Sequence, residues 1–448
     1  MKKLTMPHPL VLLTSGIFLA AALTWVLPAG AYERRDDSVS GKTVVVNGTY
    51  HAVPAAPVSP TGALVAVPKG LAAGADVIFF VFLAGGALLV LDRTGALRGA
   101  VDGLSSALGG REMLTIPVFC LVFGFLGAVE NMQEEIIALI PVLLFVTRRA
   151  GFDALTAAAM SVGAAMVGSA FSPVNPFQAV IAQKLAGLPV GSAFGFRLVM
   201  VVFALALWTA ATMRHATRTR GAPVEMADAP PAGAAGARTR AVMIIAVVAF
   251  GYFVWGVTYG GWGFEEMGAL FLGLGIVGGI VGGLGFSGTA EGFAEGFRSM
   301  AYASLLIGFA RVISVVLQQG QVMDTIVHGL FTPLAHLPIA ASATGMVAVQ
   351  GLIHVAVPSV SGQAALTMPV LVPLSDLLGM SRQVTVLAYQ TGAGMCELLT
   401  PTNGALMAVI AAAGVPFDKW MRFALPLVAI LVGGALLSIY LAIAIGLQ

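Results

Sequence analysis

Long apolar segments separated by short polar ones run through the whole chain. A helix that crosses the hydrocarbon core of a bilayer needs about 20 consecutive apolar residues. Segments of about this length lie at residues 9–30, 74–92, 194–213, 241–257, 266–286, 300–318 and 423–446. The pattern therefore predicts an all-α polytopic membrane protein.

Two other apolar segments, 154–185 and 383–412, are too long for one straight transmembrane helix. The first contains thirty consecutive uncharged residues, and as one helix these would span about 45 Å, against a hydrocarbon core of about 30 Å. Each segment contains a proline–asparagine motif: SPVNP at 172–176 and TPTNG at 400–404. Because proline removes a backbone donor and frees carbonyls one turn earlier, we expect both helices to be broken at these motifs.

Two pairs of apolar arms are instead too short to cross a bilayer. A helix of thirteen residues reaches only about 20 Å, so each pair is better explained as a re-entrant hairpin that enters and leaves on the same side. The arms are 113–129 with 135–147, separated by ENMQEE, and 341–357 with 363–378, separated by PSVSG.

The polar loop 214–240 sets the predicted orientation. It carries five arginines, so the positive-inside rule places it in the cytoplasm, and its Ala/Pro/Gly-rich middle predicts a flexible linker. Counting spans from this loop puts the N-terminus in the cytoplasm, and puts loop 31–73 and the C-terminus outside. The other basic residues that agree with this orientation are Lys2, Lys3, Arg148, Arg149, Lys419 and Arg422.

The two halves of the chain match when one is shifted by 228 residues. Pro141 then meets Pro369, Gly151 meets Gly379, and Ser172-Pro173-Val174-Asn175 meets Thr400-Pro401-Thr402-Asn403. With the orientation above, the first hairpin enters from the cytoplasm and the second from outside, so the repeats are inverted. Interrupted helices at corresponding places in two such halves indicate the midplane binding site of a transporter.

This repeat predicts how the chain is divided into domains. A scaffold would be built from two parts, and a transport domain from one hairpin, one broken helix and one further helix of each half. The expected boundaries are 1–112 for the first scaffold part, which ends in an interfacial arm, 113–213 for the first transport repeat, 214–240 for the linker, 241–340 for the second scaffold part and 341–448 for the second transport repeat.

The two breaks supply candidate ligands for a coupling ion. Carbonyls freed by proline, together with nearby hydroxyl and amide side chains, can coordinate Na⁺ or a polar substrate, and an acidic residue can carry H⁺. The alternative is a simple proline kink that neighbouring helices satisfy. The candidate coupling-ion residues are Ser172, Pro173, Asn175, Glu397, Thr400 and Asn403.

The two hairpin tips differ in charge. Carboxylates at bilayer depth are costly and usually functional, so the acidic first tip could hold a proton, a metal cation or a cationic group, although solvation is the simpler alternative. The neutral second tip offers small residues and backbone amides that suit a substrate carboxylate. The candidate substrate-binding residues are Glu130, Asn131, Glu134, Glu135, Asn175, Ser359, Ser361, Gly362, Gln363, Thr402 and Asn403.

Two other polar residues in apolar segments have competing interpretations. Arg311 could be a substrate counter-ion or part of an internal salt bridge, and we expect His354 to be packed inside the second hairpin. The cysteines, Cys120 and Cys396, are expected to be buried thiols without a disulfide or metal. Residues 1–31 resemble a signal peptide, but we interpret them as an ordinary first transmembrane helix.

Composition excludes several functional classes. The chain is 58% hydrophobic and 10% charged, its net charge is +2, and its mean hydropathy is +0.93, which argues against a nucleic-acid partner. It has no P-loop, HExxH or GxSxG motif, and GLGIVG at 273–278 lies inside an apolar span, where helix packing explains it. We therefore expect no enzyme activity and no cofactor beyond a coupling ion; an ion channel or an intramembrane enzyme is the alternative of another class.

The run SGQAALTMPVLVPLSDLLGMSRQVTVLAYQTGAG (361–394), the opening MPHPLVLL…LTWVLPAG and the run Asp153-Ala154-Leu155-Thr156 resemble the anaerobic four-carbon dicarboxylate carrier (DcuC) family, specifically its YfcC-like branch. The family belongs to the ion transporter superfamily. The resemblance implies a multi-pass protein of the bacterial inner membrane, a scaffold that forms a homodimer, and a transport domain that moves as an elevator.

The resemblance leaves the substrate open. The name-giving members carry four-carbon dicarboxylates such as succinate and fumarate, whereas YfcC-like members resemble carriers of basic amino acids such as arginine and ornithine. The dicarboxylate carriers have a Ser-Asn-Thr-type motif at the tips, where this chain has Glu130-Asn131-Met132 and Ser359-Val360-Ser361. Because clustered carboxylates repel a dianion, we expect a cation-coupled transporter or exchanger of a small amino acid, with a dicarboxylate as the alternative.

Overall fold

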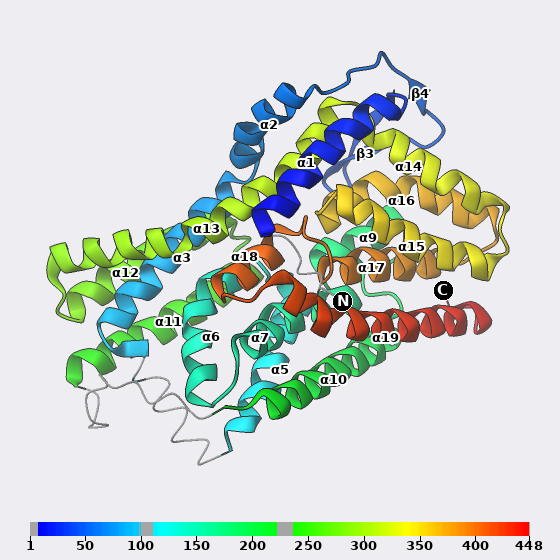
Figure 1. Cartoon of the computed structure of the whole chain (residues 1–448). Helices are drawn as coiled ribbons and strands as arrows, with labels where there is room; N and C mark the ends of the chain where they lie inside the picture. Colours follow the sequence, from blue (N-terminus) through cyan, green and yellow to red (C-terminus); the bar gives the residue numbers. More distant parts are fainter. Residues whose placement is uncertain (1–7, 98, 100–110, 222–235, 448) are drawn as a thin grey trace, which may run out of the picture.

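A computed structural model describes residues 8–97, 99, 111–221 and 236–447 (Figure 1). Nine helical segments among these residues are long and apolar enough to cross a membrane, which confirms the prediction of a multi-pass membrane protein. The predicted interfacial arm lies largely outside the described residues, as do Lys2, Lys3 and the middle of the predicted linker.

The seven predicted single spans are all helices. They are α1 (Pro9–Val26), α3 (Ala75–Arg93), α10 (Phe194–Thr219), α11 (Ala237–Tyr259), α12 (Phe264–Val281), α13 (Gly285–Gln319) and α19 (Phe417–Ala444). The expected start of α13 at residue 300 was wrong, because charged residues in its first half lower the local hydropathy without ending the helix. One of them, Glu295, forms a salt bridge with Arg93 of α3, and α3 and α13 pack along each other.

Among the described residues, the β-strands that depart from an all-α fold lie in the predicted external loop. Its strands are β1 (Gly30–Ala31), β2 (Arg34–Asp37), β3 (Lys42–Val45) and β4 (His51–Ala52), followed by α2 (Pro60–Ala73). β1 pairs antiparallel with β4, and β2 with β3. These strands are only two to four residues long, so they leave little trace in a hydropathy pattern.

This β-rich loop is fastened to α14 (Met323–Phe331), a short helix that the pattern did not predict. The carboxylate of Asp324 accepts hydrogen bonds from the Tyr32 amide and from the Arg34 guanidinium, both at 2.8 Å. The ring of Tyr50 stacks on His328 with 4.0 Å between centroids. Burial, with the nearby charge of Asp324 and the neighbouring Tyr50, raises the pKa of Tyr32 to about 12, so its hydroxyl stays protonated.

Each predicted hairpin consists of two helices joined by a short turn. The first is α5 (Thr115–Glu130) and α6 (Glu135–Arg149), and the second is α15 (Ile339–Ala356) and α16 (Val360–Leu377). The expectation that all their arms are too short to cross a bilayer was wrong for the entry arms, because Glu112–Glu130 and Ile339–Ala356 are long and apolar enough to do so. The 3₁₀ turn η4 (Thr332–His336) precedes α15, just as η1 (Glu112–Leu114) precedes α5. The entry arms pack mainly on the broken helices, α5 on α8 and α15 on α17.

Both long apolar segments are interrupted where the motifs predicted. The first comprises α7 (Ala154–Ala158), η2 (Ala159–Gly163) and α8 (Ala164–Phe171) before the break, and η3 (Pro176–Val180) and α9 (Ile181–Leu185) after it. The second comprises α17 (Arg382–Glu397) and α18 (Gly404–Ala412). Asn175 and Asn403 are the N-caps of the halves that follow the breaks, which is a favoured role for asparagine.

The repeat is visible in the structure. The first halves of the broken helices begin at Ala154 and Arg382 and the second halves at Pro176 and Gly404, so both pairs are 228 residues apart. The corresponding helices α10 and α19 lie side by side (Figure 1). They run antiparallel, because His215 contacts Phe423 whereas the earlier Phe203 lies beside the later Gly434. Antiparallel packing of corresponding helices is the relation that an inverted repeat requires.

The two repeats interlock around their breaks. α8 crosses α17, α6 packs on α18 of the other repeat, and α16 packs on α9. Each return arm therefore contacts the second half of the opposite broken helix, which brings both hairpin tips and both breaks to the same part of the molecule.

Glycines let α5 and α8 approach closely enough to place the first tip. A Cβ at Gly127 would lie 2.1 Å from the Ala165 carbonyl oxygen, and a Cβ at Gly168 would lie 2.0 Å from the Gly124 carbonyl oxygen. Such small-residue contacts are typical of helix pairs in membranes. On α12, Gly275 packs in the same way against Ala87 of α3, as expected for the GLGIVG run.

Replacing Gly168 by alanine should destabilise the protein, because the added methyl group meets backbone atoms that cannot rotate away. Overpacking of this kind costs about 1–3 kcal/mol, so the thermal unfolding midpoint in detergent should fall. Gly433→Ala is the matched control, since nothing lies within 4 Å of a Cβ there. Equal midpoints for the two variants would contradict this account of the α5–α8 contact.

Replacing Asp324 by alanine should release the β-rich loop from α14. The change leaves the Tyr32 amide without its acceptor, which costs about 1–3 kcal/mol for a buried donor. Limited proteolysis should then cut within residues 31–59 faster than in the wild type. Asp37→Ala, in the same loop but remote from α14, is the control, and similar cleavage of both variants would argue against the role of Asp324.

Candidate functional site

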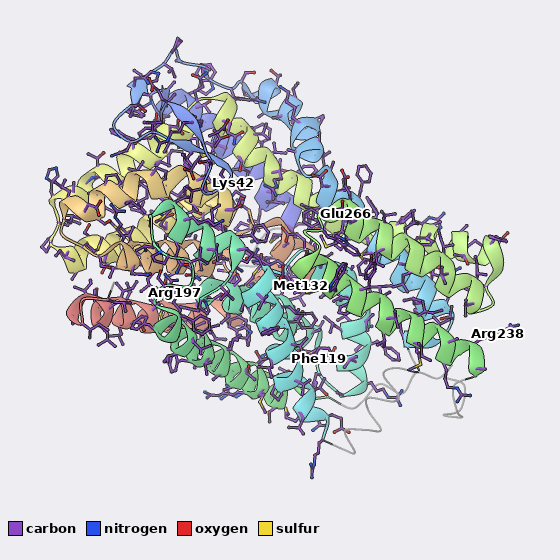
Figure 2. All side chains as sticks on the ribbon, turned by 180° about the vertical axis from the view of Figure 1, so that it is seen from behind. Lys42, Phe119, Met132, Arg197, Arg238 and Glu266 are labelled. Carbon is purple, nitrogen blue, oxygen red and sulfur yellow. The ribbon has the colours of Figure 1, made fainter. Side chains whose placement is uncertain are left out.

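A cavity of about 750 Å³ lies where the two hairpin tips and the two breaks meet. Its walls come from the α5–α6 turn, the α15–α16 turn, both breaks and parts of α12 and α13. Met132, in the first tip, lies near the middle of the molecule in Figure 2. The cavity therefore lies where the hairpin tips and the interrupted helices of the two repeats come together.

Many of the predicted site residues line this cavity. They are Glu130, Asn131, Glu134, Glu135, Ser359, Ser361, Glu397, Thr402 and Asn403. The tertiary structure thus brings together residues that are more than 270 positions apart in the sequence. Ser172, Pro173, Asn175, Gly362, Gln363 and Thr400 are not among the lining residues.

The first tip gathers its carboxylates through a tight turn. Asn131 ends α5 with a left-handed backbone (φ 56°), and α6 begins four residues later at Glu135. The Glu135 carboxylate accepts a hydrogen bond of 3.1 Å from the Gln133 amide. All three glutamates of this tip are partly buried, so their charges are incompletely hydrated and act strongly on whatever enters the cavity.

Glu397 is a buried carboxylate that both repeats hold. It lies at the end of α17 and accepts hydrogen bonds from the side-chain amides of Gln133 (3.0 Å), Gln178 (3.3 Å) and Asn403 (3.5 Å). All three donors are neutral. A carboxylate with only neutral partners can take up a proton or a monovalent cation, because no fixed positive charge already compensates it.

The neutral side of the cavity is formed by two helix N-termini. Ser359 caps α16 by accepting from the Gly362 amide, and Asn403 caps α18 by accepting from the Leu406 amide. The amides of Val360, Ser361, Gly404 and Ala405 belong to residues that line the cavity, and within the described part of the chain no hydrogen bond from them is found. The first amides of a helix are available to an anion in this way.

The first break is closed by the protein itself. The Ser172 hydroxyl donates to the Ala128 carbonyl (2.6 Å), and the carbonyl of Ser172 accepts from the Gln390 side chain (2.8 Å). The Asn175 side chain donates to the Gly127 carbonyl (2.9 Å) and accepts from the Phe177 and Gln178 amides. These oxygens, expected to coordinate an ion, are thus engaged by protein donors.

Three other predicted site residues, Gln363, Thr400 and Gly362, do not line the cavity. The Gln363 side chain donates to the Gln350 carbonyl (2.7 Å) and contacts His354 (2.8 Å), so it joins the arms of the second hairpin. His354 is buried there, as expected. Thr400 shares a hydrogen bond of 2.7 Å with Thr402, and Gly362 is exposed.

Sequence reasoning missed an amide network behind the cavity. The side chain of Gln178 contacts Asn131, Ser169 and Glu397, and Gln390 bonds to the buried guanidinium of Arg197, labelled in Figure 2. Arg197 is only 1% exposed. A lone arginine inside an apolar span was the available signal, since such residues are usually functional.

Arg311 lines the cavity and acts electrostatically on Glu134. Among the described residues it forms no salt bridge with a carboxylate, which leaves its guanidinium available to a ligand. Trp262, Phe264 and Phe177 add aromatic surface. The described residues contain no cluster of His, Cys, Asp and Glu suited to a metal ion, and Cys120 and Cys396 are free thiols.

Comparisons with known proteins extend this description. The chain is 31% identical to the "Putative basic amino acid antiporter YfcC" of Escherichia coli (strain K12), over 96% of this chain and 95% of that protein. It is 28% identical to an uncharacterized protein of Haemophilus influenzae (strain ATCC 51907 / DSM 11121 / KW20 / Rd), over 99% of this chain and 98% of that protein.

Two solved transporter structures align over most of the chain. The YdaH transporter of Alcanivorax borkumensis aligns with 98% of this chain and 99% of its own, at 18% identity and a TM-score of 0.44. MtrF of Neisseria gonorrhoeae aligns with 97% and 94%, at 14% identity and a TM-score of 0.40. At these scores neither structure bears on the fold or the transport cycle.

The family assignment rests instead on sequence. A family model described as C4-dicarboxylate anaerobic carrier matches residues 6–444, and its match agrees with the resemblance carried by residues 361–394. This match covers nearly the whole chain, both hairpins and both broken helices included. The chain is therefore a membrane transporter that belongs to the DcuC family of C4-dicarboxylate anaerobic carriers.

Proposed function

We propose that this transporter is a cation-coupled secondary transporter or exchanger of a small amino acid, with a basic one such as arginine or ornithine as the specific candidate. The observation that carries the proposal is the polarity of the cavity. Carboxylates gather on the first tip, and unpaired backbone amides gather at the second tip and the second break. An amino acid presents the complementary pair of charges.

The carboxylate of the substrate is assigned to the two helix N-termini. α16 and α18 both begin at the cavity, and their positive ends favour an anion. The hydroxyls of Ser359 and Ser361 lie beside the free amides of α16, and Gly404 keeps the start of α18 free of side-chain bulk. This arrangement binds the substrate carboxylate through backbone amides and hydroxyl groups, without a positively charged side chain.

The amino groups of the substrate are assigned to the first tip. Glu130, Glu134 and Glu135 face the same cavity as Arg311, so carboxylates outnumber guanidinium groups among the described residues that line it. A substrate with two amino groups and one carboxylate fits this balance better than a dianion does. The name of the relative in Escherichia coli, "Putative basic amino acid antiporter YfcC", agrees with this choice.

A four-carbon dicarboxylate is the second candidate. Arg311 favours it, because a guanidinium could pair with a second substrate carboxylate, and so does the family name. In that case the acidic tip would serve the coupling cation. The two candidates therefore differ in what Glu134 and its neighbours bind.

The coupling ion is proposed to be H⁺ or Na⁺ at Glu397. This carboxylate connects Gln133 of the first tip, Gln178 of the first repeat and Asn403 of the second, so a change in its charge would act on both breaks. The closed first break leaves the second as the better place for an ion.

We also propose that the two hairpins are re-entrant and that the transport domain moves as an elevator. We further propose that the protein forms a homodimer and lies in the bacterial inner membrane, with a cytoplasmic N-terminus and an external C-terminus.

The substrate class can be tested by counterflow of labelled arginine into proteoliposomes that contain the purified protein. Unlabelled ornithine should compete, whereas succinate and fumarate should not, because the first tip repels a dianion. Liposomes without protein give the background. Uptake of labelled succinate with none of arginine would replace the amino-acid proposal by the dicarboxylate one.

Glu134→Gln should weaken arginine transport about 10- to 100-fold in kcat/KM, since a charge-assisted hydrogen bond contributes roughly 1.5–3 kcal/mol. Thermal unfolding should change little, because the amide has the same shape. Glu291→Gln, on the exposed face of α13, is the control for the loss of one acidic charge. Wild-type transport by the Glu134 variant would remove this residue from the substrate site.

A further inference from the structure

A second cavity lies between α10 and α19, and the transport proposal does not use it. Its volume is about 640 Å³, and it shares no lining residue with the cavity at the hairpin tips. It is built by the last helix of each repeat, with a small contribution from Leu155 at the start of α7. A ligand bound here would contact both repeats at once.

Polar and apolar residues are segregated along this cavity. On α10, Arg214 and Arg218 are one turn apart, and Leu207 and Ala211 continue the same stripe toward the middle of the helix. On α19, Arg422 is followed by Pro426, Leu427 and Ile430. The cavity thus has a basic end and an apolar floor.

Two of the basic side chains at that end have no acidic partner. The side chains of His215 and Lys419 both lie 3.2 Å from the Asp153 carboxylate, and Arg422 pairs with Asp418 at 2.9 Å. Within the residues that the structure describes, Arg214 and Arg218 form no salt bridge, and both are exposed. Positive charge at this end is therefore in excess.

We propose that this cavity binds one anionic phospholipid, with its phosphate between Arg214 and Arg218 and an acyl chain along the apolar floor. Both walls are helices long and apolar enough to cross a membrane, and Ile430 on the floor is 55% exposed. The floor is therefore open to an acyl chain, and a basic pocket between such helices matches an anionic headgroup. A neutral headgroup would leave the guanidinium charges uncompensated.

The opposite end of the α10–α19 pair differs in charge, which restricts the proposed lipid site to one leaflet. The last part of α19, residues 431–444, contains no charged residue. The charged residue near the start of α10, Arg197, is buried and bonded to Gln390. On the described residues of these two helices, the opposite end therefore offers no exposed basic side chain that could hold a headgroup. By the positive-inside rule, the basic end belongs to the cytoplasmic leaflet.

The test uses the full-length protein in detergent and measures lipid binding by native mass spectrometry. Dioleoyl phosphatidylglycerol should bind the Arg214→Gln/Arg218→Gln variant about 30-fold more weakly than the wild type, because each basic residue near a membrane surface contributes about fivefold in affinity. The control Arg238→Gln/Arg240→Gln removes the same charge at the start of α11, away from this cavity (Figure 2), and should bind like the wild type. Dioleoyl phosphatidylcholine should bind weakly to all three proteins.

A second variant tests the apolar floor while keeping the charges. Ala211→Trp should fill the acyl-chain position and reduce phosphatidylglycerol binding at an unchanged unfolding midpoint. An equal loss of phosphatidylglycerol binding in the Arg214/Arg218 variant and in the Arg238/Arg240 control would show that the lipid is held by diffuse surface charge, and would overturn the site. Wild-type affinity in the Ala211 variant, or displacement of the lipid by millimolar inorganic phosphate, would also overturn it in favour of a soluble anion. None of these outcomes depends on which substrate is transported.

Discussion

The architecture depends on one constraint, which is that backbone groups exposed by a break in a buried helix must find partners. An apolar medium offers none, so each unpaired amide or carbonyl costs free energy unless the protein or a ligand satisfies it. Both breaks share the same sequence logic, a proline that ends the first half and an asparagine that caps the second. They differ in which groups are then satisfied by the protein.

At the first break the protein supplies nearly every partner. Gln390 of the other repeat reaches the Ser172 carbonyl, and Asn175 bonds back to α5 at Gly127. At the second break, Gly404 and Ala405 keep their amides facing a cavity instead. The two breaks thus share one backbone design but differ in their partners. Protein groups satisfy the first break, whereas the second leaves backbone amides available at the cavity.

The two hairpin tips also differ, in their charge. The first tip carries the carboxylates, whereas the second tip is neutral and offers amides, and corresponding positions such as Asn131 and Ser359 lie 228 residues apart. Because the helices interlock, with α6 on α18 and α16 on α9, these unlike surfaces face one another across one cavity. Two corresponding hairpins with unlike tips therefore give the cavity one acidic side and one side of backbone amides.

The sequence by itself determined the elements that physical length and periodicity control. Apolar segments near 20 residues became helices, segments too long to span became broken ones, and the prolines with their following asparagines marked the breaks within a few residues. The pattern did not predict the short strands at 30–52, α14 or the first half of α13. The strands are short and are held by a distant residue, Asp324, and the charged first half of α13 pairs with Arg93 of α3, so local hydropathy does not reveal either of them.

Only the tertiary structure decided which predicted site residues meet a common cavity. The tip glutamates, Glu397 and Asn403 reach it, but Gln363 bonds to its own hairpin and Ser172 to α5. Sequence reports that a polar side chain lies in an apolar segment, but not which partner compensates it, since that partner is chosen by packing. The amides of Gln133, Gln178 and Gln390 became visible as a network only when helices from both repeats were brought together.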